Sequence, residues 1–151
     1  MRAKEYLEQL GGIMANLERR QEQLEELRRE CFDAKAIRYD KDIIQNSGKN
    51  MVEERMIQYL DKAREIEGVM AYYFEQKDKL IGQIEELAEG TDKNGENYAS
   101  LLYKRYVERK RFEQIAKEMD YSHEWIRHMH KDALKAFWRL HLRETQDSTF
   151  S

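Results

Sequence analysis

The sequence contains no proline, only seven glycines and a single cysteine among its 151 residues. Sheet proteins need frequent turn residues between short strands, and this chain has few of them. Charged residues make up 38% of the chain and hydrophobic residues 40%, a balance that is typical of long amphipathic helices. We therefore expect an all-α protein.

The scarcity of cysteine and of long apolar runs indicates the cellular compartment of the protein. Cys31 has no second cysteine to pair with, which favours a reducing compartment. No apolar run approaches the roughly 20 residues that span a bilayer. The first residues, MRAKEYLEQL, also lack the apolar core of a signal peptide. These features predict a cytoplasmic protein with no membrane partner.

The charge is unevenly distributed along the chain. Residues 1–102 carry 16 Lys and Arg against 22 Asp and Glu, whereas residues 103–143 carry 11 against 6. The formal net charge of −3 conceals this asymmetry. It predicts that only the C-terminal part of the chain meets a polyanion.

The N-terminal part has the spacing of a coiled-coil helix over residues 3–30. Apolar side chains recur every seven positions, or three residues later, at Leu10, Ile13, Leu17, Leu24, Leu27 and Cys31. Gly11 and Gly12 predict a weak point or kink, because each glycine costs roughly 1 kcal/mol relative to alanine inside a helix.

A second long helix is predicted over residues 51–88. Its apolar stripe consists of Met56, Tyr59, Leu60, Ala63, Ile66, Met70, Tyr73, Leu80, Ile84 and Leu87. Its natural partner is the first helix, packed antiparallel, or the same helix of a second subunit. A turn-rich connector at 45–50 follows the first helix. We expect residues 1–95 to form a long antiparallel helical hairpin, or coiled coil, through which the chain forms a homodimer.

Residues 96–143 are predicted as a second domain, followed by a polar tail at 144–151. Three helices are expected in this domain, over residues 96–110, 112–119 and 122–140. The last two have the spacing of a helix-turn-helix, which is a common DNA-binding motif.

The turn of this motif is predicted at Asp120. Aspartate tolerates the left-handed backbone that such a turn needs, and Ser122 is a good N-cap for the helix that follows. Tyr121 is expected to plug the turn into the core. The side chains expected to face inward are Ile115, Ala116, Met119, Ile126, Met129, Ala133, Leu134 and Phe137. A generic amphipathic hairpin would explain the apolar spacing but not the chemistry of the turn.

The outward face of the helix over 122–140 is the candidate DNA-reading surface. Its base-edge candidates are His123, Glu124, Arg127 and His128. Arg127 could donate two hydrogen bonds to guanine, and Glu124 could accept one from cytosine. The candidates for phosphate contacts are Lys104, Arg105, Arg109, Lys110, Arg111, Ser122, Lys131, Lys135 and Arg139.

The segment from Leu101 to Phe137, about a quarter of the chain, resembles region 4 of sigma-70 factors, which reads the −35 promoter element. From Ser122 the chain reads Ser-His-Glu-Trp-Ile-Arg-His-Met-His-Lys-Asp-Ala-Leu-Lys-Ala-Phe, where that family has Thr-Arg-Glu-Arg-Ile-Arg-Gln-Ile-Glu-Ala-Lys-Ala-Leu-Arg-Lys-Leu. The resemblance implies DNA contacts at the four base-edge candidates. Two of them are identical in the family, whereas His123 replaces Arg and His128 replaces Gln. The target sequence therefore need not be the −35 consensus.

A coiled-coil front joined to a region 4-like end is similar to phage and prophage regulators of the ArpU and RinA type. This likeness implies control of late phage transcription. The leading hypothesis is a sequence-specific transcription regulator that binds double-stranded DNA, with RNA polymerase as a second candidate partner.

Other functions stay open or are disfavoured by the residues. The alternatives are a DNA-packaging protein similar to a phage terminase small subunit, which would form rings, and a sigma-like module that binds RNA polymerase rather than DNA. No paired carboxylates, nucleophile motif or phosphate loop predicts an enzyme or a cofactor. His123, His128 and His130 do not share one helical face, so no metal site is expected.

Overall fold

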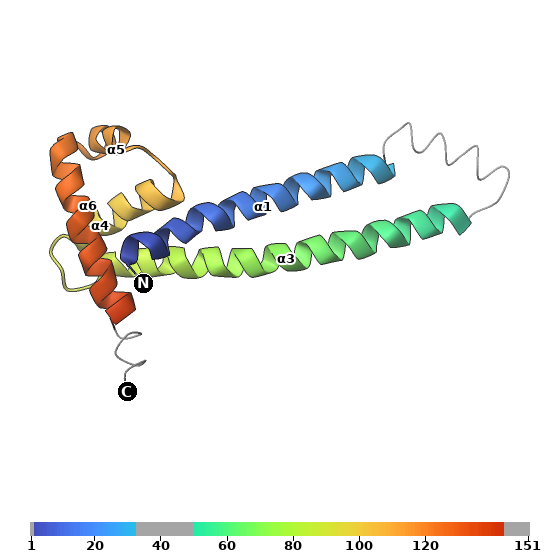
Figure 1. The fold of residues 1–151 in the computed structure, drawn as a ribbon, viewed down its shortest axis with the longest axis horizontal. Coiled ribbons are helices and arrows are strands. Elements are labelled where there is room, and N and C mark those ends of the chain that lie inside the picture. The colour runs from blue at the N-terminus through green and yellow to red at the C-terminus, as the bar shows by residue number, and fades with distance from the viewer. Residues whose placement is uncertain (1, 33–49, 144–151) are drawn as a thin grey trace. The chain divides into compact units, whose positions relative to one another are not determined.

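The computed structural model describes residues 2–32 and 50–143, and these residues are helical apart from short connections (Figure 1). The helices are α1 (Ala3–Phe32), α3 (Asn50–Glu89), α4 (Gly95–Leu102), α5 (Phe112–Met119) and α6 (His123–Phe137), with the π-helical segments η1 (Tyr103–Val107) and η2 (Trp138–Leu142). No strand occurs within the described residues, so the predicted all-α class is confirmed. Most of the predicted connector and the whole predicted tail lie outside the described residues.

The chain divides into two compact units, and α1 and α3 each contribute to both. The first unit combines Met1–Ile13 with Gln76–Ser151, and the second is Met14–Glu75. The predicted domain boundary at residue 95 therefore lies inside the first unit. Of the described helices, none has the length and apolar character needed to cross a membrane.

The second unit contains the later turns of α1 and the earlier turns of α3. Leu17 of α1 is buried, as are Ala63 and Met70 of α3. The Phe32 ring meets the Tyr59 ring edge-on, with 4.9 Å between their centroids. Leu24, Leu27 and Cys31 are half-buried whereas their neighbours are exposed. The predicted seven-residue seam of α1 is thus confirmed, and α1 runs through Gly11 and Gly12 without interruption.

The predicted apolar stripe of α3 is right for its later turns and wrong at two early positions. Ala63, Met70, Leu80, Ile84 and Leu87 are buried. Met56 and Leu60, however, are 42% and 43% exposed. Tyr59 and Ala63, four residues apart, occupy the covered side of the helix, which turns Leu60 away from it. Phe32 is the last described residue of α1, and it contacts Tyr59. Met56 lies nearly one helical turn before Tyr59, so it lies beyond this contact.

The first unit is built around α6, which packs against α4 and α5 (Figure 1). Its fully buried side chains come from five helices: Leu7, Leu10, Ile84, Leu101, Leu102, Ile115, Ile126 and Phe137. Two hydrogen bonds to Gln83 of α3 connect distant segments. Tyr6 Oη donates to its side-chain oxygen at 2.7 Å, and His141 Nε2 donates to its backbone oxygen at 2.8 Å. This core holds α6 with one side buried and the other open to solvent.

Candidate nucleic-acid interface

The turn between α5 and α6 has the predicted chemistry. Asp120 adopts the left-handed conformation, with φ 58° and ψ 42°, and the Tyr121 N–H donates to the Ala116 carbonyl at 3.0 Å. Ser122 is extended, and its Oγ accepts a hydrogen bond from the Trp125 N–H at 3.1 Å. The predictions for Asp120 and Ser122 are both confirmed. Together the two residues end α5 and start α6 in a defined direction.

The inward side of the two helices is also as predicted. The buried side chains are Ile115 and Ala116 from α5 and Ile126, Met129, Ala133 and Phe137 from α6. Met119 and Leu134 are half-buried and pack against this core. Since the inward positions fix the rotation of α6 about its axis, they also fix which residues face solvent.

Tyr121 is the exception, because it lies outside the core. Its side chain is 38% exposed, its ring lies 6.2 Å from the ring of Trp125, and its hydroxyl accepts a hydrogen bond from Asn97 Nδ2 at 3.5 Å. The prediction that Tyr121 fills the core is therefore wrong. Ile115 and Ile126 are the buried side chains on either side of the turn, whereas the Tyr121 ring lies at the surface beside Trp125.

The four base-edge candidates are all exposed on the first turns of α6. The His123 ring lies edge-on to Phe112 of α5, with 6.5 Å between centroids, so α5 orients it. In the described parts of the chain, no ion pair engages Glu124, Arg127 or His128. Their side chains are thus available to a ligand.

Three of the predicted phosphate contacts are already occupied within the protein. Lys110 Nζ pairs with Glu108, and with Glu118 at 2.6 Å, and Lys104 Nζ lies 3.6 Å from Glu118. The hydrogen bonds that Lys110 donates to the two carboxylates raise the pKa of Lys110, and the one donated to Glu118 lowers the pKa of Glu118. The charges of Lys104 and Lys110 are thus compensated by carboxylates of the protein itself. These ion pairs connect η1 to α5.

Arg105 is the third occupied cation. Its guanidinium carbon lies 4.1 Å from the centroid of the Phe112 ring, and its Nη1 donates to the Lys110 carbonyl at 3.0 Å. This cation–π contact and the hydrogen bond hold the segment between η1 and α5. The same segment contains Arg109, a non-glycine residue with a φ of 58°.

The remaining phosphate candidates point to solvent. Arg109, Arg111, Lys131, Lys135 and Arg139 are exposed, and Ser122 is exposed while its hydroxyl caps α6. Lys131, Lys135 and Arg139 are four residues apart, so they form a row along one side of α6 and η2. The structure brings this row together with the base-edge candidates on the outward side of α6.

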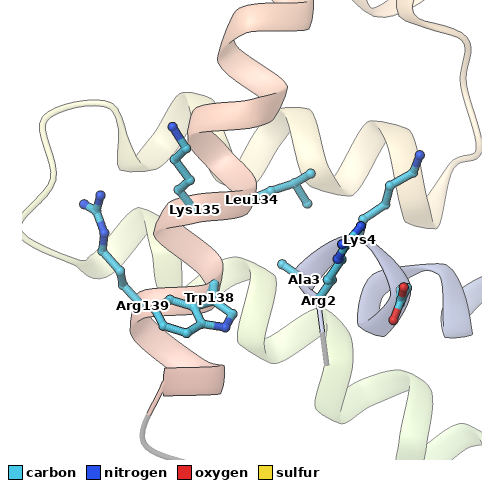
Figure 2. Close-up of a pocket in the computed structure, with 8 residues that line it drawn as sticks. Arg2, Ala3, Lys4, Leu134, Lys135, Trp138 and Arg139 are labelled. Carbon is cyan, nitrogen blue, oxygen red and sulfur yellow. The ribbon is translucent and has the colours of Figure 1, made fainter. Parts of the chain in front are cut away.

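A cationic cleft contains Arg2 and Lys4, which were not among the DNA contacts predicted from the sequence. Arg2, Ala3, Lys4 and Glu5 at the start of α1 line one side, and Leu134, Lys135, Trp138 and Arg139 line the other (Figure 2). Its volume is about 670 Å³. Arg2 and Lys4 are the only side-chain cations of the first ten residues. Their position at the start of an otherwise acidic half is the sequence feature that could have identified them. We call this feature the α1–α6 cleft.

A hydrogen-bonded pair lies beside the surface, between η1 and α6. Tyr106 Oη and His130 Nε2 are 2.9 Å apart. Burial raises the pKa of Tyr106 to about 12. Burial, followed by the positive charges of Arg105 and Lys4, lowers the pKa of His130 to about 4. His130 is therefore neutral at pH 7, and its role is to join α6 to η1.

The half-buried His130 makes the stability of the first unit depend on pH. The unfolded chain binds a proton near pH 6.5, whereas the folded chain does so only near pH 4. The stability that depends on neutral His130 is therefore fully present above pH 6.5 and is lost as the pH falls toward 4. The loss is about 1–2 kcal/mol once the partial exposure of His130 is allowed for. Urea titrations at several pH values should show this loss. His130→Gln, which keeps a partner for Tyr106, should flatten the profile, and an unchanged profile in that variant would exclude His130 as its cause.

Within the described residues, no group of three or more His, Cys, Asp or Glu side chains is placed to hold a metal ion. Comparisons with protein-family models, with curated proteins and with solved structures give no match for this chain.

Proposed function

We propose that the protein is a sequence-specific DNA-binding transcription regulator that reads duplex DNA with α6. The proposal is supported chiefly by the exposed polar side chains on the outward side of α6. Its first turns expose Glu124, Arg127 and His128 without internal ion pairs among the described residues. The capped turn at Asp120–Ser122 and the buried inward side hold these residues on a rigid helix, as base recognition requires.

In this proposal α5 and α6 act as a helix-turn-helix. The N-terminal turns of α6 enter the major groove, where Arg127 donates to a guanine and Glu124 accepts from a cytosine amino group. His123 and His128 contact neighbouring bases or phosphates. Lys131, Lys135 and Arg139, together with the exposed Arg109 and Arg111, neutralise phosphates and set the register of the protein on DNA.

We further propose that α1 and α3 pack as an antiparallel coiled-coil hairpin that forms a homodimer. The exposed apolar side chains of α3, among them Met56, Ile57 and Leu60, support a surface for a second copy. A dimer would place two recognition helices about one helical turn of DNA apart. This arrangement suits the phage or prophage regulators that the sequence resembles.

The proposal is tested by Arg127→Ala. Removing a bidentate contact to guanine should weaken specific binding by about 1–3 kcal/mol and relax base preference at one position. Lys131→Ala is the matched control, because loss of a phosphate contact should weaken all sequences equally. Both can be measured by fluorescence anisotropy on selected and scrambled duplexes. If Arg127→Ala binds both duplexes as the unaltered protein does, α6 is not the reading helix.

A further inference from the structure

The α1–α6 cleft concentrates positive charge from two distant segments of the chain. Arg2, Lys4, Lys135 and Arg139 are all exposed, and no ion pair between described residues engages them. Figure 2 shows the first two and the last two on opposite sides. Glu5 is the one carboxylate in the lining. The positive end of the dipole of α1, a helix of 30 residues, adds to the field.

The floor of the cleft is apolar and continues the proposed reading surface. Leu134 and Trp138, both half-buried, lie between the cationic walls (Figure 2). Arg127, Lys131, Leu134 and Trp138 follow one another at spacings of three or four residues, so they share one side of α6 and η2. The cleft therefore overlaps the row of phosphate candidates at Lys135 and Arg139.

We infer that the α1–α6 cleft holds the sugar–phosphate backbone of a DNA duplex, with Arg2 and Lys4 as phosphate contacts. The inference rests on the proposed function. A helix in the major groove is flanked by backbone strands, since the groove is only about 12 Å wide. Cations on both walls suit a chain of phosphates that crosses the cleft, and the apolar floor suits the deoxyribose between them.

Salt dependence tests this assignment, because each phosphate that is neutralised releases counterions on binding. The slope of log Kobs against log salt changes by about 0.9 for each phosphate contact in duplex DNA. Arg2→Gln with Lys4→Gln should therefore make the slope shallower by about 1.8 and weaken binding at least about tenfold at 0.1 M salt, equally on all sequences. The probe is a fluorescein-labelled random-sequence duplex, followed by anisotropy.

The matched control is Lys62→Gln with Arg64→Gln in the full chain. These residues are exposed on α3 in the second unit, and the pair removes the same two charges. The control should leave the slope unchanged. If Arg2→Gln with Lys4→Gln also leaves it unchanged while Lys131→Gln reduces it, this inference is overturned and the proposed function stands. If the unaltered protein binds no duplex, the proposed function fails and the inference fails with it.

Trp138 supplies a second readout. The chain has two tryptophans, so Trp125→Phe leaves Trp138 as the only one. Bound duplex should shield Trp138 from acrylamide quenching of its fluorescence. Unchanged quenching with the duplex fully bound would show that the backbone does not occupy the cleft.

Discussion

Replacing Phe137 with alanine is expected to lower the free energy of unfolding by about 3–5 kcal/mol. The Phe137 side chain is fully buried, and its ring contacts Tyr6 of α1 at 5.8 Å and His141 of η2 at 4.9 Å between centroids. The loss combines the transfer free energy of the ring with the cavity that it leaves. Small domains have only about 5–15 kcal/mol of stability, so the first unit should be largely destabilised.

Leu140→Ala is the control for this prediction. Leu140 lies three residues further on and is 44% exposed, so its truncation should change the stability by about 0.5 kcal/mol or less. Thermal unfolding followed by circular dichroism would separate the two variants. A Phe137→Ala protein that unfolds at the same temperature as Leu140→Ala would contradict the burial of Phe137 in the core.

Gly95→Ala is the second change with a large expected effect. A Cβ atom at Gly95 would lie 2.2 Å from the carbonyl oxygen of Leu87 and 3.3 Å from its carbonyl carbon. Both are backbone atoms, so no side chain can move aside and the start of α4 must separate from the end of α3. Overpacking of this kind typically costs about 1–3 kcal/mol, and we expect the upper end of that range.

The matched control is Gly82→Ala. Gly82 lies within α3, and a Cβ atom there would meet nothing within 4 Å. Because alanine favours helix over glycine, this change should stabilise the protein by about 0.5–1 kcal/mol. Urea unfolding of the two variants should therefore shift in opposite directions. A Gly95→Ala protein as stable as the unaltered chain would contradict the close crossing of α3 and α4.

Local chemistry accounts for the parts of the structure that the sequence predicted well. The left-handed Asp120 and the Ser122 cap depend on residues within one turn of each other, and the seam through Leu10 and Leu17 depends on regular spacing. Tyr121 was mispredicted because its surroundings depend on Asn97 and Trp125 rather than on its own turn.

The composition of the candidate site depends more on tertiary contacts. Nothing in the sequence distinguishes Lys110 from an exposed cation, and only the fold places it beside Glu118. Tyr106 and His130 are 24 positions apart, and no spacing rule relates them. Arg2 and Lys4 line one cleft with Lys135 and Arg139 only because the start of α1 lies near the end of α6. Contacts between distant segments cannot be predicted from local periodicity.

Selection from a random duplex library at two salt concentrations shows whether α6 reads duplex DNA. We expect the unaltered protein to enrich one motif at both salt concentrations and Arg127→Ala to lose selectivity at one position of that motif. Half-site spacing within the motif would also report whether a dimer binds. If binding is weak and sequence-blind, disappears at the higher salt concentration and does not differ between the two proteins, α6 does not read DNA sequence.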